Sequence, residues 1–307
     1  MNRNKSQKLH SATTALQRDH HRTSSGNRAA TPLVFVIVAV FALYFLMPIY
    51  WLLVSTTKNT GQLFASAMLL PPVHPNLIAN LVWLDSHDGG VFWRWALNSV
   101  IYAGCTATLA TLICASGGYA LAKYRFSLRK PVLAMVVGAL MIPPAALVIP
   151  IFLLVKFLGI MDTYAAVILP MLVNPFGVYF MSVYTGEAVA GELIDSGRVD
   201  GASDYGILFR IALPIMRPGL VTLFLILFIG TWNNFFLPLV LLNRTSLYPL
   251  PVGLQNWLST ISQAGMGPPI YPLVVVGSFL SILPMLILFP ILRRHIVAGI
   301  TLGSVKA

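Results

Sequence analysis

Long apolar runs alternate with shorter polar stretches along most of the chain. Six runs are each long enough to cross a hydrocarbon core of about 30 Å, which takes roughly 20 helical residues. They contain no Asp or Glu, and their one basic residue, Lys156, lies at the end of a run. The pattern predicts an all-α membrane protein with six transmembrane helices, at residues 33–55, 96–122, 132–156, 164–185, 219–242 and 272–292.

The composition agrees with this pattern. The chain is 57% hydrophobic and only 9% charged, whereas about a quarter of the residues in soluble domains carry a charge. The first apolar run is longer than the core of a secretion signal, and no small-residue cleavage site follows it. We therefore expect it to be retained as a helix.

The basic residues decide the orientation in the membrane. If the six runs are helices, the 20 Lys and Arg residues fall mainly on the side of the two termini, and the exceptions are Lys58, Arg94, Lys156 and Arg244. By the positive-inside rule, both termini are cytoplasmic. The net charge of +11 is then explained by topology and by attraction to anionic membrane lipid, and no nucleic-acid partner is expected.

This topology divides the chain into four segments. Residues 1–31 are polar and basic and lack the large apolar side chains that a core needs, so we expect a disordered cytoplasmic tail. Residues 32–95 would hold the first helix and an external segment, which ends in the aromatic run FWRW at 92–95, interpreted as an interfacial anchor. Residues 96–292 would form the transmembrane core, and 293–307 a cytoplasmic C-terminus.

Several classes of function lack the residues that they need. Proton-coupled carriers and ion pumps usually need an ionisable group within the membrane, which disfavours a secondary carrier here. No Gly-Lys pair occurs in the chain, so the phosphate loop G-x-x-x-x-G-K-[ST] is absent, and any ATP would be bound by another polypeptide. No paired acid and base and no metal-ligand cluster is evident. We therefore expect no enzyme activity, and no metal or cofactor bound by this chain.

The loop at 186–218 departs from the apolar pattern, because it contains the mixed-charge stretch DSGRVDGASDYGILFRIALPIMRP. Residues 189–200 can form a short helix that Gly201 ends with a sharp turn. Ser203 and Asp204 suit the start of a second helix, since their side-chain oxygens can accept from unpaired N–H groups. Two short helices at the cytoplasmic surface would then present an apolar ridge, made of Ile207, Leu208, Phe209, Ile211 and Leu213.

The spacing of Asp195, Gly201, Ile211, Leu213 and Pro214 resembles the motif E-A-A-x3-G-x9-I-x-L-P of membrane subunits in binding-protein-dependent ABC importers. The chain is most similar to the carbohydrate-uptake branch, and within it to the smaller membrane subunit that the maltose permease typifies. Other stretches resemble this family in the same order, namely PIYWLLVSTTK (48–58), LNSVIYA (97–103), GYALAKYRFSLRK (118–130), MIPPAALVIPIFLLVKFLGIMDTYAAVILP (141–170), GTWNNFFLPLVLL (230–242), LYPLPVGL (247–254) and RRHIVAGITLGSVKA (293–307).

The resemblance implies a type I ABC importer permease fold in the inner membrane of a prokaryote. It implies three kinds of partner: a homologous permease subunit in a heterodimer, a dimer of ABC ATPases that carries ATP-Mg, and an extracytoplasmic solute-binding protein. It also implies that the loop couples the helices to the ATPase through Asp195, Ser196, Gly197, Asp200, Gly201, Ala202, Phe209, Ile211, Leu213 and Pro214. An amphipathic hairpin that only rests on the membrane is the alternative interpretation.

The start of the motif is its least typical part. The family commonly has Glu-Ala-Ala where this chain has Asp195, Ser196 and Gly197. A Gly inside a helix costs roughly 1 kcal/mol relative to Ala, so a less rigid first coupling helix is expected.

Polar residues within the helices mark a candidate solute path, comprising Asn98, Tyr102, Trp232, Asn233, Asn234 and Ser278. Neutral amide, hydroxyl and aromatic groups suit an uncharged sugar or polyol better than an ion. The same residue types also hold helices together in lipid, which is the competing interpretation. The predicted function is ATP-driven import of a sugar or related polyhydroxylated solute. The alternatives are a secondary carrier or channel that works without ATP, and a membrane scaffold that transports nothing.

Overall fold

The computed structural model describes residues 27–65, 67–264 and 270–301, and all of its regular elements are helices. The chain divides into two compact units, one ending at Pro75 and one starting at Asn76. The predicted cytoplasmic tail lies outside the described residues as far as position 26. From Asn27 onward the backbone is helical, so the first helix begins earlier than its apolar run alone predicts.

The first unit contains α2 (Asn27–Thr56) and the short α3 (Thr60–Ala65). From Val34 onward, α2 is long and apolar enough to cross a membrane. The segment after α2 folds over the helix end, because the Lys58 ammonium group donates hydrogen bonds to the carbonyl oxygens of Ala67 at 2.8 Å and Met68 at 3.3 Å. These bonds allow a lysine side chain to be buried at this position.

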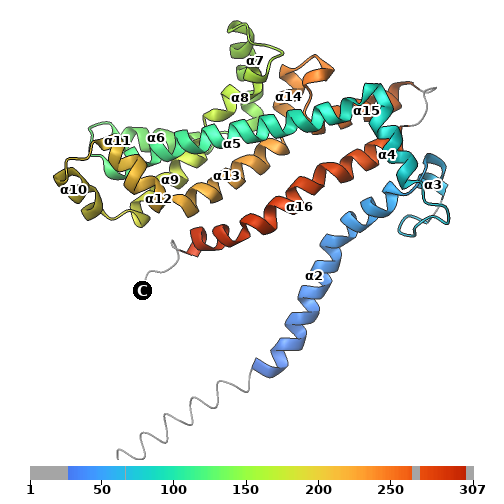
Figure 1. Ribbon diagram of the computed structural model, residues 1–307, viewed down its shortest axis with the longest axis horizontal. Helices are drawn as coiled ribbons and strands as arrows, with labels where there is room; N and C mark the ends of the chain where they lie inside the picture. Colours follow the sequence, from blue (N-terminus) through green and yellow to red (C-terminus); the bar gives the residue numbers. More distant parts are fainter. Residues whose placement is uncertain (1–26, 66, 265–269, 302–307) are drawn as a thin grey trace, which may run out of the picture. The chain divides into compact units, whose positions relative to one another are not determined.

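The second unit holds the remaining helices, several of which are short pieces of broken spans (Figure 1). In chain order they are α4 (Leu77–Ser86), η1 (His87–Gly89), α5 (Val91–Lys123), α6 (Arg129–Ala139), η2 (Pro144–Leu147), α7 (Val148–Phe157), α8 (Tyr164–Leu172), α9 (Pro175–Ala188), α10 (Gly191–Val199), α11 (Asp204–Ile207), the π-helical η3 (Leu208–Ala212), α12 (Leu213–Ile215), α13 (Arg217–Trp232), α14 (Phe236–Leu241), η4 (Thr245–Leu247), α15 (Leu250–Ala264) and α16 (Tyr271–Thr301).

The longest helix of this unit, α5, lies at its centre, since α8, α9, α13 and α15 all pack against it. Its buried face is rich in small residues, which let neighbouring backbones approach closely. The closest approach is at Gly118, where an added Cβ would lie 2.6 Å from Met181 Cβ and 2.7 Å from the carbonyl carbon of the same residue. Only a glycine at this position allows α5 and α9 to pack at this distance.

Three of the six predicted spans are single straight helices in outline, and three are broken. Among the described residues, three helices are long and apolar enough to cross a membrane alone, and counting each bent pair as one span raises the number to as many as six. The span predicted at 132–156 is bent by 99° between α6 and α7, and that at 164–185 is bent by 42° between α8 and α9. The span at 219–242 stops at Trp232 and resumes at Phe236.

Proline explains two of these breaks. Pro143 and Asn174 both have extended backbone angles, and each directly precedes a proline, Pro144 and Pro175 respectively. The ring of a proline clashes with a helical conformation of the residue before it. A continuous helix over 132–156 was therefore the wrong expectation, although the prolines that break it are visible in the sequence.

The pieces on the side of these breaks that the topology predicts to be external pack against one another. Val155 of α7, Ala166 of α8 and two leucines of α14, Leu237 and Leu241, form one buried cluster. Figure 1 shows α7, α8 and α14 gathered beside the middle of α5. We call these three helices the external cluster.

The aromatic run at the start of α5 is part of the core. Phe92 and Trp95 are 1% exposed and pack with Trp257 of α15 and Leu273 of α16, whereas Trp93 and Arg94 of the run are exposed. The interpretation of FWRW as an interfacial anchor was therefore wrong for two of its three aromatic residues. They hold α15 and α16 against the first turns of α5.

Candidate functional site

The mixed-charge loop forms the two short helices that its sequence predicts. The helix α10 ends at Val199, and Gly201 has a φ of +79°, the left-handed conformation that favours glycine. The N–H of Gly201 donates to the carbonyl of Arg198 at 3.0 Å. The Ser203 hydroxyl accepts from the N–H of Gly206 at 3.2 Å and so caps α11, which confirms the predicted helix start.

One face of this loop is part of the bundle core. Ile194 of α10 is buried, together with Ile207, Leu208 and Ala212, among residues of α5, α9 and α13. Burying a large aliphatic side chain contributes about 1.5–3 kcal/mol, so the loop is anchored to the bundle by several such residues. Ile211 and Leu213 pack at the edge of the same cluster. The predicted apolar ridge is thus mainly an inward face.

Gly197, the departure from the family pattern, lies where the two coupling helices meet. A Cβ added to it would be 3.0 Å from Ile211 Cδ1 and 3.3 Å from Ile207 Cγ1. The absence of a side chain lets α10 and η3 approach closely at this point. This close packing therefore offsets part of the stability that a glycine costs a helix relative to alanine.

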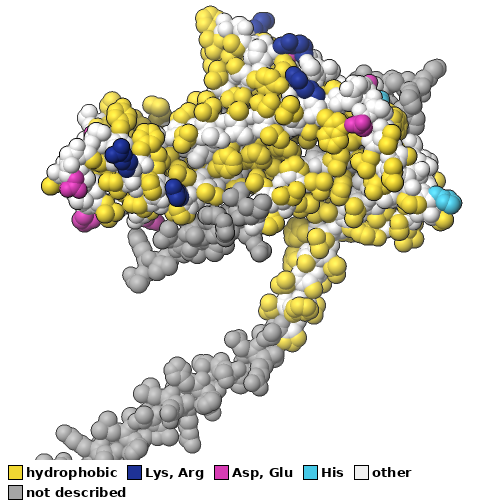
Figure 2. Space-filling view, in the orientation of Figure 1, with side chains coloured by type: hydrophobic (Ala, Val, Ile, Leu, Met, Phe, Trp, Pro, Cys, Tyr) yellow, Lys and Arg dark blue, Asp and Glu magenta, His cyan; other side chains and the backbone are white. Residues whose placement is uncertain are grey.

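The opposite face of the loop carries exposed apolar side chains. We call this the outer apolar set: Leu193, Val199, Tyr205 and Phe209, with exposed fractions of 43%, 87%, 78% and 60%. Charged side chains surround it at this end of the molecule, as Figure 2 shows. Phe209 is among the residues that the sequence analysis assigns to the coupling loop, and Leu193, Val199 and Tyr205 are further exposed apolar residues beside it.

Charge on the loop centres on Arg198. Its guanidinium lies 3.4 Å from the Asp204 carboxylate across the Gly201 turn and 3.8 Å from the Asp195 carboxylate on its own helix. The Asp195 side chain is 78% exposed, and exposed ion pairs contribute about 0–1 kcal/mol. Asp195 therefore contributes little to the shape of the loop, and the turn and the buried face set that shape.

Three of the predicted path residues are engaged with backbone of neighbouring segments. The Asn98 amide donates to the carbonyls of Ser246 at 2.9 Å and Tyr248 at 3.0 Å, and it accepts from the Tyr164 hydroxyl at 2.6 Å. The Tyr102 hydroxyl donates to the carbonyl of Leu247 at 3.1 Å, and the Trp232 indole donates to that of Ser281 at 3.2 Å. All three side chains are buried.

The other three path residues are more accessible. Asn233 is exposed and Asn234 half-buried, and together they form the break between α13 and α14. The Asn234 amide contacts the Met171 sulfur of α8 at 3.5 Å. Ser278 of α16 is half-buried. The structure thus places two neighbouring amides at a helix break, where the Asn233 amide donates to the carbonyl of Ile229 at 3.0 Å and Asn234 Oδ1 accepts from the N–H of Leu237 at 3.3 Å.

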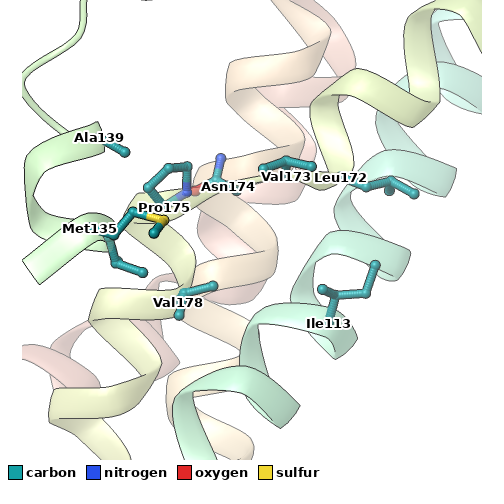
Figure 3. A pocket seen from close by; sticks show the side chains of 9 residues that line it. Ile113, Met135, Ala139, Leu172, Val173, Asn174, Pro175 and Val178 are labelled. Carbon is teal, nitrogen blue, oxygen red and sulfur yellow. The ribbon is translucent and has the colours of Figure 1, made fainter. Parts of the chain in front are cut away.

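An open pocket lies beside the break between α8 and α9 (Figure 3). Its volume is about 340 Å³, and it is bounded by α5, α6 and the α8–α9 break. Asn174, which caps α9, contributes the one polar side chain to a lining of Ile113, Met135, Val136, Ala139, Leu172, Val173, Asn174, Pro175 and Val178. Such an apolar lining does not offer the convergent polar groups that a sugar needs.

Within the described residues, no group of three or more His, Cys, Asp or Glu side chains could hold a metal ion.

Comparison with known proteins gives consistent results. Residues 107–302 match the family described as binding-protein-dependent transport system inner membrane component. The chain is 31% identical to the arabinooligosaccharides transport system permease protein AraQ of Bacillus subtilis, covering 94% of this chain and 99% of the relative. It is 30% identical to the lactose transport system permease protein LacG of Rhizobium radiobacter, covering 89% and 95%.

A solved structure shares the fold. A chain in the crystal structure of a bacterial ABC transporter involved in the import of the acidic polysaccharide alginate superposes with a TM-score of 0.77 at 25% identity, covering 88% of this chain and 98% of that one. The family match at residues 107–302 includes the mixed-charge loop at 186–218, and both relatives are named as permease proteins. The chain belongs to the family of binding-protein-dependent ABC transporter inner-membrane permeases.

Proposed function

We propose that this chain is a permease subunit of an ABC importer for a sugar, an oligosaccharide or a related polyhydroxylated solute. It would work with a homologous permease subunit, a dimer of ATPases and an external solute-binding protein. Support for the solute class comes from the relatives, whose names specify arabino-oligosaccharides and lactose. Support for the partners comes from the alginate transporter, one structure of which includes a periplasmic protein that carries an alginate pentasaccharide.

The observation that carries the proposal is the two-faced coupling loop. Its inner face is anchored in the bundle core by Ile194, Ile207 and Leu208, and its outer apolar set faces away from the core. An apolar centre with a charged rim is the usual composition of a protein docking surface. A force applied to the outer apolar set would be transmitted to α9 and α13, which continue directly from the two ends of the loop.

In this mechanism, ATP-driven closure of the ATPase dimer moves the coupling loop, and the bundle converts the movement into alternating access to the two sides of the membrane. Asn233, Asn234 and Ser278 are the proposed solute contacts. Asn98, Tyr102 and Trp232 would form the support behind the path, because they are buried and their polar groups are bonded to carbonyls of other segments.

The experiment is substitution of Phe209 by Ser in the complete importer reconstituted in lipid vesicles. We expect retention of the ATPase to fall about tenfold, since aromatic residues at the centre of an interface commonly contribute more than 1 kcal/mol. Leu128→Ser is the matched control, because Leu128 is also an exposed apolar residue near the cytoplasmic end but lies outside the loop.

Two results would overturn the proposal. One is a Phe209→Ser complex that retains its ATPase as well as the Leu128→Ser complex does. The other is solute uptake that continues without ATP and collapses when an ion gradient is removed, which would identify a secondary carrier.

A further inference from the structure

The cytoplasmic end of α5 contacts the coupling loop at several points that the motif does not include. Tyr124 directly follows α5 and begins the connection to α6. Its ring lies under the Arg198 guanidinium, 6.0 Å from ring centroid to Cζ. The Asp204 carboxylate, which lies 3.4 Å from Arg198, is also close enough to the Tyr124 hydroxyl to raise its pKa. One side chain therefore contacts both coupling helices, because Arg198 belongs to α10 and Asp204 to α11.

A second aromatic residue, Tyr119, supports the contact between Tyr124 and Arg198. The Tyr119 ring packs edge-on against the Tyr124 ring, with centroids 5.7 Å apart, and Tyr119 is 2% exposed within the same core cluster as Ile194 and Ile207. Partial burial, with the neighbouring Tyr119 and Asp204, raises the pKa of the Tyr124 hydroxyl to about 12. The hydroxyl therefore keeps its proton at physiological pH and can donate it to a carboxylate.

A second bond lies one residue earlier. The Lys123 ammonium group donates to the carbonyl of Gly186 near the end of α9, at 3.2 Å. The end of α5 is thus attached both to the helix that enters the coupling loop and to the two helices within the loop. The covalent backbone, by contrast, connects the loop only to α9 and α13.

We propose that Tyr124 is a positioning residue that links the coupling loop to α5 and α6, so that these helices move with the loop during the transport cycle. The inference rests on the proposed function, since it assumes that the loop is moved by an ATPase. The geometry favours a stiff link, because the ring contacts both the Arg198 guanidinium and the buried Tyr119 ring. Cation–π and hydrogen-bond contacts of this kind depend on orientation as well as distance.

The test measures whether the two segments move together. Spin labels would be placed at Leu128→Cys, before α6, and at Glu192→Cys, in the first turn of α10, with Cys105 replaced by Ser. Distances between the labels would be recorded in the complete importer, without nucleotide and with ATP trapped. We expect the wild-type separation to be the same in both states. In Tyr124→Leu the separation should change between the states, and ATP hydrolysis without solute should rise about threefold to tenfold.

Matched variants separate positioning from a general loss of structure. Phe126→Leu alters an exposed aromatic residue in the same connection and should behave as wild type. Tyr124→Phe keeps the ring under Arg198 and should fall between wild type and Tyr124→Leu. Arg198→Gln removes the same contact from the other side and should reproduce the effect of Tyr124→Leu without altering α5.

Three outcomes would overturn the inference: a wild-type label separation that changes with ATP, a Tyr124→Leu variant that matches Phe126→Leu, or an Arg198→Gln variant that keeps the segments together. The proposed function would fail differently, because wild-type protein would then be isolated without any ATPase. The two failures are therefore distinguishable in the same preparation.

Discussion

Asp162 and Arg244 form a clamp between two external connections that are far apart in the sequence. The Arg244 Nε donates to Asp162 Oδ2 at 2.7 Å, and its terminal guanidinium nitrogen donates to the Asp162 carbonyl at 2.5 Å. Asp162 Oδ1 accepts from the backbone N–H groups of Asn243 and Arg244, each at 3.0 Å. The α7–α8 turn is thereby tied to the segment that follows α14.

The clamp closes the external cluster. Asp162 has a φ of +60°, and its N–H donates to the carbonyl of Leu241 at 3.1 Å, so its backbone takes part as well as its side chain. α7, α8 and α14 all lie beyond a break in their spans, and the clamp restrains them as a group. This arrangement is suited to a small body that moves on several hinges without coming apart.

Replacing Asp162 by Ala should loosen the external cluster. The variant loses one charge-assisted bond and two bonds from backbone N–H groups, so we expect the free energy of unfolding to fall by about 1–3 kcal/mol. Thermal unfolding of the purified protein would measure the change. Asp85→Ala is the control, since the Asp85 carboxylate accepts one bond, from the Trp93 indole at 2.9 Å. Equal losses in the two variants would contradict a special role for the clamp.

The same clamp predicts a dependence on pH. The pKa of Asp162 is held below its usual range, first by the backbone N–H of Arg244 and, against the opposing effect of burial, also by the N–H of Asn243 and by the guanidinium. A lowered pKa in the folded state means that the stabilisation is complete above the unfolded value of about 3.9 and is lost as the pH falls below it. The difference in unfolding temperature between wild type and Asp162→Asn should therefore be constant from about pH 7 to pH 5 and shrink below about pH 4. A difference that grows on acidification would contradict this assignment.

The sequence predicts the helices well where one local rule decides. Apolar length locates α2, α5 and α16, and Gly201 with Ser203 gives the turn and the cap of the coupling loop. The bends follow from prolines that are plain in the sequence, but their angles depend on tertiary packing, which no local rule contains. The clamp between Asp162 and Arg244 is not predictable, because 82 residues separate its partners.

For the candidate site, the sequence indicates which residues belong to it better than it indicates which residues they contact. Apolar periodicity indicates that the two short helices of the loop have a buried face, but it does not say which apolar residues meet the bundle, and only the fold shows that Val199 and Tyr205 are exposed. Likewise, Asn98 and Tyr102 were predicted as polar residues within a helix, yet only the fold brings the carbonyls of 246–248 to them. The sequence alone therefore does not decide whether a polar residue in a membrane helix lines the solute path or packs against another helix, because its hydrogen-bond partners come from the fold.

The close contact between α5 and α9 predicts a strong effect at Gly118. In Gly118→Ala the new methyl group would overlap backbone atoms of Met181 and Ser182, which cannot rotate away, so we expect a loss of about 1–3 kcal/mol in the free energy of unfolding. Gly104→Ala is the matched control on the same helix, because no atom lies within 4 Å of its added Cβ. That variant should be neutral or more stable by up to about 1 kcal/mol, as alanine favours a helix. Thermal unfolding of both variants checks the difference, and similar behaviour would contradict the packing assignment.

Asn98 offers a direct separation of packing from solute binding. Asn98→Leu leaves two carbonyls and the Tyr164 hydroxyl without their buried partner, which should lower the free energy of unfolding by about 1–3 kcal/mol. Asn233→Leu changes the same side chain at an exposed position and should alter solute uptake with little effect on unfolding. If Asn98→Leu unfolds like wild type but loses uptake, Asn98 contacts solute directly and its role as support is wrong.

The turn at Gly201 should tolerate some side chains and reject others. No atom lies within 4 Å of a Cβ added there, so the restriction comes from the φ of +79° and not from a collision with neighbours. The left-handed conformation costs an ordinary residue roughly 1–2 kcal/mol, whereas Asn adopts it more readily. Gly201→Val should therefore shift the turn and reduce ATP-driven uptake at least severalfold, while Gly201→Asn should stay close to wild type. Both variants should insert in the membrane equally well, which quantification in isolated membranes would verify. If uptake is reduced equally in the two variants, side-chain bulk at the docking surface, and not backbone geometry, controls coupling.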